Sequence, residues 1–286
     1  MRISIIGLGL IGGSLGLALK KANWMSAEIT GYVRRPETGK LALNIGAVDR
    51  IASTLEESVN KSDLVIISTP VLTIKDIFHH IAPYLPKNCI VTDTASTKQQ
   101  VMNWAQEILP AGISFIGGHP MAGTHSSGLE YAQSGLFLNS TYCLVCGTQT
   151  TPAAEKTLTD MIQEIGSTPM KISAQEHDNM AAGISHLPFL LSAALVLTTS
   201  GNPDWDKMSQ LASSGYRDTT RLASGSIDVN AQICLTNQEA ILYWMDLFGK
   251  ELKKLENLIA DRDEDIINTL NSANKARRKW QAKYHQ

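Results

Sequence analysis

The stretch that decides the fold is Ser4–Gly16, SIIGLGLIGGSLG. A β-rich run leads into an apolar, helix-like run, and Gly7, Gly9 and Gly12 lie between them in the spacing G-x-G-x-x-G. The first glycine permits a tight turn, the second lets a pyrophosphate approach the backbone, and the third lets helix and strand pack closely. The sequence therefore predicts a dinucleotide-binding turn. Its cofactor-binding residues are Gly7, Leu8, Gly9, Leu10, Ile11 and Gly12.

Up to about residue 172, short β-branched runs alternate with helix-like stretches. This alternation favours an α/β fold, in which a Rossmann-type, doubly wound sheet is mainly parallel and its last strands add in a different order or antiparallel. The helix-like stretches are Ser14–Ala22, Glu37–Leu43, Thr73–Ala82, Lys98–Ile108 and Ala153–Ile165. We therefore expect a nucleotide-binding domain over residues 1–172.

Strand signals disappear after residue 173, which predicts an all-α domain over residues 173–286. The run Glu176–Gly201 is typical of a long, largely buried helix with a kink at Pro188. Further on, apolar residues recur every three or four positions, as in a helical stripe. This stripe, which fits either a homodimer seam or an intrachain core, consists of Ile241, Trp244, Phe248, Leu252, Leu255 and Ile259.

Composition excludes several classes of protein. The chain has 25 Lys and Arg against 27 Asp and Glu, a balance that argues against a nucleic-acid or membrane-surface partner. Its four cysteines are too few and too scattered for a disulfide framework. Cys143 and Cys146 lie in a strand-like run, where residues three apart point to opposite faces, so we expect neither a disulfide nor a metal. The apolar start of the chain resembles a signal peptide, but its regularly spaced glycines favour the structural motif. A reduced, cytoplasmic protein is expected.

The second strand-like run indicates which dinucleotide binds. An acidic residue there would hold the ribose 2′-hydroxyl of NAD, but the run Ile29–Pro36 contains none. Arg34 lies 22 residues after Gly12, and a guanidinium can hold a 2′-phosphate. We therefore predict NADP rather than NAD, although arginines at a strand end are also common on protein surfaces. The predicted contacts of the dinucleotide beyond the first turn are Val33, Arg34, Arg35, Thr69, Pro70 and Ser96.

Two further segments carry candidate chemistry. His119 lies in GGHPMAGT, Gly117–Thr124, which its glycines and proline predict to be an irregular loop after a strand. A histidine accepts a hydroxyl proton near neutral pH with little tuning, so His119 is the candidate base. Ser96 follows the preceding strand and is expected to hydrogen-bond His119, the substrate hydroxyl or the nicotinamide amide.

The helical half contributes His186 and the cluster Arg217, Asp218 and Arg221. Arg217 and Arg221 share a face if the stretch is helical, and two arginines there indicate an anionic substrate held through a carboxylate. Asp218 is expected to orient one of them. A core histidine and a surface salt-bridge cluster are the alternative interpretations.

At this point the chain resembles a known family. The segments GLGLIGGSL, DTASTK, GGHPMAGT, ISHLPF and SSGYRDTTR occur in the same order as the hallmark segments of the prephenate/arogenate dehydrogenases, over nearly the whole chain. The resemblance implies oxidative decarboxylation of a cyclohexadienyl carboxylate: hydride leaves ring C4 for the nicotinamide, the ring carboxylate leaves as CO₂, and tyrosine or 4-hydroxyphenylpyruvate results. It also implies a homodimer through the helical domain.

The same resemblance implies a role for each candidate residue. His119 deprotonates the C4 hydroxyl with Ser96 as its hydrogen-bonding partner, and Arg221 binds a substrate carboxylate. The remaining substrate-binding candidates, at the pocket or its gate, are Thr124, His186, Arg217 and Asp218. One departure is His125, which stands where some members carry a glutamate after MAGT. No regulatory or chorismate mutase domain is recognised in the sequence.

Two alternatives remain. A β-hydroxyacid dehydrogenase or imine reductase would share the architecture, but those hydroxyacid enzymes usually carry a catalytic lysine on the long helix, and Glu176–Thr199 has none. A regulator that senses NADP without catalysis would have no use for Ser96, His119 and both arginines. Prephenate and arogenate differ by a keto group against an ammonium, and the sequence does not separate them.

Overall fold

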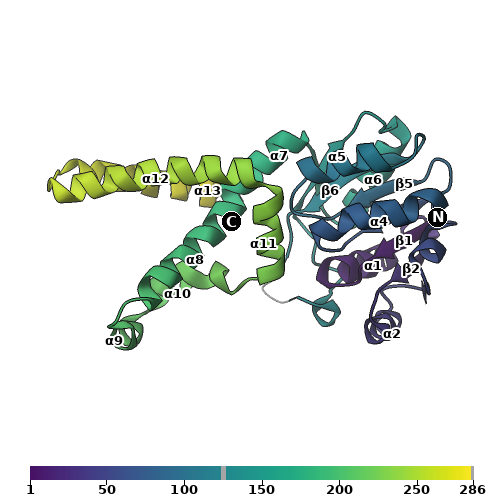
Figure 1. The fold of residues 1–286 in the computed structure, drawn as a ribbon, viewed down its shortest axis with the longest axis horizontal. Helices are drawn as coiled ribbons and strands as arrows, with labels where there is room; N and C mark the ends of the chain where they lie inside the picture. Colours follow the sequence, from purple (N-terminus) through teal and green to yellow (C-terminus); the bar gives the residue numbers. More distant parts are fainter. Residues whose placement is uncertain (124–126, 285–286) are drawn as a thin grey trace. The chain divides into compact units, whose positions relative to one another are not determined.

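The computed structural model describes residues 1–123 and 127–284 of the chain, which forms two compact units, Met1–Gln238 and Glu239–Gln286. The first unit is built on an eight-stranded sheet in the order β3-β2-β1-β4-β5-β6-β7-β8 (Figure 1). β1 to β6 are parallel, β7 is antiparallel to β6, and β8 is parallel to β7. The strands are β1 Arg2–Ile6, β2 Glu28–Tyr32, β3 Arg50–Ile51, β4 Leu64–Ile67, β5 Ile90–Asp93, β6 Ser114–Pro120, β7 Thr141–Cys146 and β8 Thr168–Lys171. The predicted doubly wound sheet is confirmed.

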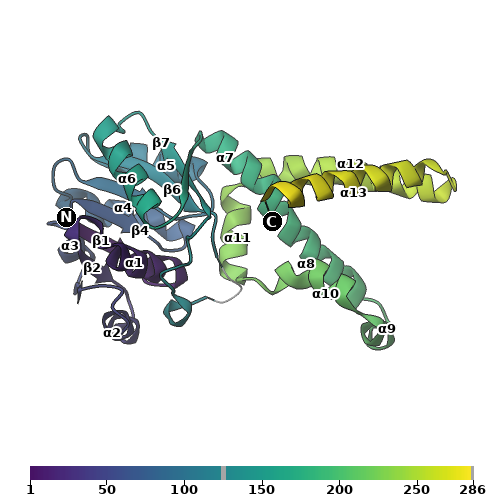
Figure 2. The ribbon, with the colours of Figure 1, turned by 180° about the vertical axis from the view of Figure 1, so that it is seen from behind.

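Helices cover both faces of this sheet, as the views from front and back show (Figures 1 and 2). On one face, Leu15 and Leu158 belong to a core that includes Ile5 of β1. On the other, Phe78 packs in a second core with Val65 of β4. Because both faces are buried, the central strands are continuous apolar runs. The helices are α1 Leu10–Ala22, α2 Pro36–Asn44, α3 Leu55–Val59, α4 Ile74–Ile81, α5 Gln99–Ile108 and α6 Pro152–Glu164.

The turn between β1 and α1 requires two of its glycines. Gly7 has a φ of +94°, and a Cβ placed on it would lie 2.4 Å from the carbonyl oxygen of Ser68. A Cβ on Gly12 would lie 2.0 Å from the carbonyl oxygen of Gly7. Side chains at either position would therefore open the contact between helix and strands, as the motif predicts.

A long helical run follows β8. It consists of α7 Ala174–Ala181, a π-helical segment Ala182–His186 and α8 Leu187–Ser200. The departure from α geometry thus lies in the π-helical segment before Pro188 and not at Pro188 itself. Pro188 has no N–H to donate, and the wider π turn accommodates the hydrogen bond that is missing there. The remaining helices of the first unit are α9 Trp205–Leu211, α10 Ser214–Thr220 and α11 Ile227–Thr236.

The expected burial of this long helix is wrong for the single chain. In α8 only Leu187 and Ser192 are buried, whereas Leu197 is 72% exposed. The run Ala174–Ser200 is long and apolar enough to cross a membrane, judged by length and composition alone. Packed helices of soluble proteins meet the same two criteria. Its exposed apolar surface is of the kind that marks an interaction site.

The second unit contains α12 Gln238–Ala260 and α13 Asp265–Tyr284. The predicted apolar stripe lies on α12, so its helical periodicity is confirmed. Leu252 and Ile259 of the stripe are 55% and 68% exposed, and Leu270 of α13 is 57% exposed. An intrachain core alone therefore does not bury the stripe.

Candidate active site

A cavity of about 810 Å³ lies at the carboxyl ends of β1, β4 and β5, where open α/β sheets bind ligands. The first turn, the ends of the neighbouring strands and the helical segments of the same unit all line it. Seven residues predicted to bind cofactor or substrate line this one cavity: Gly9, Leu10, Ile11, Thr69, Pro70, Ser96 and Arg221. The structure thus brings together segments that are more than 200 residues apart.

The start of α1 fits a phosphate group. Gly9 is its N-cap residue, no side chain caps the helix, and its first turn has no acidic residue. A Cβ on Gly9 would meet nothing within 4 Å, so space is open beside the backbone. Free N–H groups and the helix dipole favour an anion at this position. Leu8, in contrast, is buried in the core, and its side chain is not part of the cavity lining.

Two arginines follow β2. Arg34 and Arg35 are exposed, and Arg35 is the N-cap residue of α2. Val33 packs against the core beside them. None of the three lines the cavity, but the run Gly31–Pro36 contains no carboxylate that would repel a phosphate.

His119 lies within a strand and not in the irregular loop expected from its glycines. It is part of β6 and pairs with Cys143 of the antiparallel β7. The adjacent glycine serves close packing, since a Cβ on Gly118 would lie 2.5 Å from the carbonyl oxygen of Asp93 in β5. Pairing with β7 on one side, and the hydrogen bond from the Gly118 N–H to the Asp93 side chain on the other, therefore hold the backbone that carries the His119 ring.

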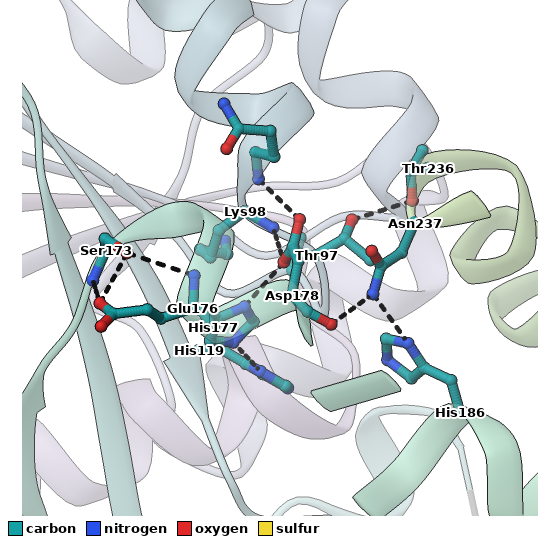
Figure 3. A network of polar contacts seen from close by, with 12 residues as sticks. Thr97, Lys98, His119, Ser173, Glu176, His177, Asp178, His186, Thr236 and Asn237 are labelled. Carbon is teal, nitrogen blue, oxygen red and sulfur yellow. Dashed lines mark hydrogen bonds and ion pairs between the residues drawn. The ribbon is translucent and has the colours of Figure 1, made fainter. Parts of the chain in front are cut away.

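His119 begins a chain of polar contacts (Figure 3). Its Nδ1 lies 2.9 Å from Nε2 of His177, and Nδ1 of His177 lies 2.8 Å from Oδ1 of Asp178. Backbone N–H groups of Lys98 and Gln99, at the start of α5, donate to the two carboxylate oxygens of Asp178 at 2.7 and 2.9 Å. His177 and Asp178 are buried. The partner of His119 is thus His177, and within the described residues no hydrogen bond joins His119 to the predicted partner Ser96.

A buried ion pair lies beneath this chain. The Lys98 ammonium contacts Asp93, and neither side chain is exposed to solvent. Asp93 also accepts backbone hydrogen bonds from Ala95 at 2.8 Å and Gly118 at 3.1 Å. Burial, together with the nearby His177 and the Lys98 charge, holds the pKa of His119 well below its usual value. His119 is therefore neutral at pH 7, the form that accepts a proton.

His186 belongs to the same network but not to the cavity lining. It is buried in the π-helical segment, and its Nδ1 lies 3.2 Å from Nδ2 of Asn237. The same amide nitrogen donates to the carbonyl oxygen of Asp178 at 2.7 Å. Burial lowers the pKa of His186 to about 4, although Asp178 opposes the shift. A neutral His186 that accepts from Asn237 carries its ring proton on Nε2.

The structure separates Arg221 from the other two residues of the predicted cluster, Arg217 and Asp218. α10 ends at Thr220, and Arg221 begins a short 3-10 turn in which it lines the cavity. Arg217 lies on α10, is exposed and pairs with Asp218 at 3.0 Å, away from the lining. The shared face expected for Arg217 and Arg221 is thus interrupted by the end of the helix. Thr124, and with it His125, lies outside the described residues.

The sequence analysis does not single out the charged and polar side chains that surround His119 and His186, among them Asp93, Lys98, His177, Asp178 and Asn237. The sequence does contain a signal for these residues, namely ionisable side chains within or beside strongly apolar segments. Asp93 ends a β-branched strand, and His177 and Asp178 adjoin the most apolar helix of the chain. Buried polar groups require partners, so such residues predict one another.

The fold and the cavity define a class of protein, a dinucleotide-binding α/β domain followed by a helical domain. Two family models match the chain: "Prephenate dehydrogenase, nucleotide-binding domain" over residues 15–171 and "Prephenate dehydrogenase, dimerization domain" over residues 173–272. The chain belongs to the prephenate dehydrogenase family, whose members are oxidoreductases.

Relatives agree with this assignment. Prephenate dehydrogenase of Bacillus subtilis (strain 168) is 34% identical over 267 residues, covering 93% of this chain and 72% of that protein. Among solved structures, Synechocystis arogenate dehydrogenase has a TM-score of 0.85 at 31% identity, covering 98% of this chain and 100% of that one. Prephenate dehydrogenase from Aquifex aeolicus, solved with hydroxyphenyl propionate and NAD+, has a TM-score of 0.91 at 28% identity, covering 98% of each chain.

Proposed function

We propose that this protein catalyses the oxidative decarboxylation of arogenate to tyrosine, of prephenate to 4-hydroxyphenylpyruvate, or of both, with NADP as the hydride acceptor. The observation that carries the proposal is the single cavity that joins the first turn, at Gly9, to Arg221. It places an anion-binding helix start and a guanidinium in the same space. The similar proteins named above, which act on prephenate and arogenate, support the same reaction.

In this reaction the first turn, Arg221, His119 and Ser96 have separate roles. The dinucleotide, bound along the first turn, supplies the hydride acceptor. Arg221 holds a carboxylate of the ring acid, because a guanidinium forms two parallel hydrogen bonds with that group. His119, neutral at pH 7, accepts the hydroxyl proton as C4 becomes a carbonyl-type carbon. Ser96 lines the cavity and is available to the hydroxyl or the nicotinamide amide. Holding the ring at the carboxylate and the hydroxyl fixes its orientation.

The preference for NADP rests on Arg34. It is exposed directly after β2, where a dinucleotide fold places the adenosine ribose, and no carboxylate accompanies it in residues 31–36. The test is kcat/KM with NADP and with NAD for the wild type and for Arg34→Asp. We expect the wild type to favour NADP and the variant to lose that preference. Equal kcat/KM values for the two cofactors in the wild type would contradict the proposal.

The decisive test of the reaction uses purified protein, both ring acids and both cofactors, with reduced cofactor measured by its absorbance. Turnover with at least one combination is expected, and none with any of them would refute the proposed function. Arg221→Ala should mainly raise KM for the ring acid, and His119→Asn should lower kcat by about 10²- to 10⁴-fold while the cofactor still binds. An unchanged KM in the first variant would show that the carboxylate is held elsewhere.

We further propose a division of the chain in which residues 1–172 bind the dinucleotide and residues 173–286 complete the substrate site and form a homodimer in the cytoplasm. The exposed apolar residues Leu197, Leu252 and Ile259 mark an interaction surface, and the second family model, that of a dimerization domain, supports a protein partner for it. Sedimentation at several concentrations tests this. A monomer mass at all of them would refute the dimer.

A further inference from the structure

The contacts around Asp178 determine where its neighbours carry protons. Each of its oxygens accepts a backbone N–H, from Lys98 at 2.7 Å and from Gln99 at 2.9 Å. Backbone N–H groups only donate, so this carboxylate is an acceptor on both oxygens. The contact of 2.8 Å with Nδ1 of His177 is then a bond that His177 donates.

The next link follows from counting ring protons. A neutral imidazole carries one ring proton, and in His177 the bond to Asp178 places that proton on Nδ1. Its Nε2 is therefore an acceptor, and the contact of 2.9 Å requires His119 to donate from Nδ1. Neutral His119 then carries no proton on Nε2, where its basic lone pair lies.

We propose that His177 and Asp178 are positioning residues that hold His119 in the tautomer with its proton on Nδ1 and its basic lone pair on Nε2. The inference rests on the proposed role of His119 as base. In the proton transfer, the O–H bond of the substrate hydroxyl breaks and an Nε2–H bond forms on His119. The Nδ1–H bond remains in place, and the imidazolium that results is linked through His177 to the Asp178 carboxylate.

The location of the pair gives the arrangement its rigidity. His177 and Asp178 lie in α7, which begins with a capping box in which Ser173 and Glu176 satisfy each other's backbone N–H groups. Asn237 holds the backbone carbonyl of Asp178 at 2.7 Å. Both the start and the side of this helix segment are thus fixed, and the His177 ring stacks edge-on to the His119 ring with centroids 5.1 Å apart.

Two substitutions of the same residue test the proposal. His177→Leu removes the acceptor for His119, whereas His177→Gln offers an amide oxygen near the position of Nε2 and loses only the link to Asp178. We expect His177→Leu to lower kcat by about 10- to 100-fold with KM for the ring acid changed less than about 2-fold. His177→Gln should recover most of that loss. His79→Gln, an exposed histidine on α4, is the matched control and should leave kcat unchanged.

The tautomer itself is measured by ¹⁵N NMR of histidine-labelled free protein, with the His119 signals assigned through His119→Asn. In the wild type and in His177→Gln we expect Nε2 of His119 to be the unprotonated nitrogen. In His177→Leu the proton should distribute over both nitrogens. This readout needs no substrate, so it stands even if turnover fails with every ring acid and the proposed function is refuted.

Either of two results would overturn the proposal. One is a wild-type His119 that carries its neutral-form proton on Nε2. The other is His177→Leu with wild-type kcat and an unchanged His119 tautomer. If His177→Leu does not fold, as judged by its thermal transition, the wild-type NMR result and His177→Gln still decide the matter.

Discussion

Replacing Lys98 by methionine isolates the buried ion pair beneath the site. The two side chains have similar length, but the variant leaves the Asp93 carboxylate with two backbone N–H donors and no cation, at a position with no solvent exposure. Removing one partner of such a pair costs about 3–5 kcal/mol of the free energy of unfolding. For a unit of this size, that loss corresponds to a lowering of Tm by about 6–20 °C.

Calorimetry and urea unfolding of the wild type and two variants measure this cost. Lys98→Met should be the least stable, and Asp93→Asn combined with Lys98→Met should recover part of the loss, because no charge is then left unpaired. Loss of the Lys98 cation also removes one cause of the low pKa of His119, so the acidic limb of kcat/KM should move to higher pH. A Lys98→Met variant that melts within about 2 °C of the wild type would refute the reasoning.

Three further predictions follow from the geometry. Gly9→Ala should keep wild-type stability within about 0.5 kcal/mol but bind the dinucleotide more weakly by calorimetric titration, whereas Gly12→Ala should itself lose about 1–3 kcal/mol, and equal stabilities would contradict this. The pKa of His186 is about 4 in the folded state against 6.5 in the unfolded state, so its contribution to the free energy of unfolding is complete above pH 6.5 and is lost as the pH falls through 4. His186→Asn should therefore reduce the acid-induced loss of stability by up to about 3 kcal/mol. Parallel plots of stability against pH for the two proteins would contradict this prediction. Ser173→Ala should cost about 1 kcal/mol in urea unfolding through loss of the helix cap, with His79→Gln as the control that shows no change.

Local signals predicted most of the fold. Glycine spacing and alternating strand and helix patterns are written in neighbouring residues, so the first turn and the doubly wound sheet followed from the sequence. The glycines around His119 predict a loop because glycines usually mark turns, whereas in the structure Gly118 is needed for close packing on Asp93. Burial of α8 was overestimated because apolarity alone does not tell whether the same chain or a second copy covers a surface.

Which residues of the polar network contact one another could not be predicted from the sequence, for a different reason. Its contacts join Lys98, His119, His177 and Asn237, which lie on separate elements of the first unit. Apart from His119, each is unremarkable by itself, and only the crossing of β5, β6 and α7 defines which ring nitrogen meets which partner. Of the three partners expected for Ser96, only the contact with His119 concerns the protein itself; among the described residues His119 instead contacts His177 of α7.

The five-residue π segment within the long helix has a consequence for how the protein tolerates changes in length. Ahead of it, α7 directs Asp178 at the start of α5; beyond it, Pro188 and Phe189 line the cavity. Deleting one residue from 182–186 would turn α8 by about 100° relative to α7. Either α7 would then lose its contacts with the start of α5, or α8 would turn Pro188 and Phe189 away from the cavity. The segment therefore sets the rotation of α8 relative to α7, and with it the positions of Asp178 and of the cavity-lining residues. Its length is constrained even where its side chains are not.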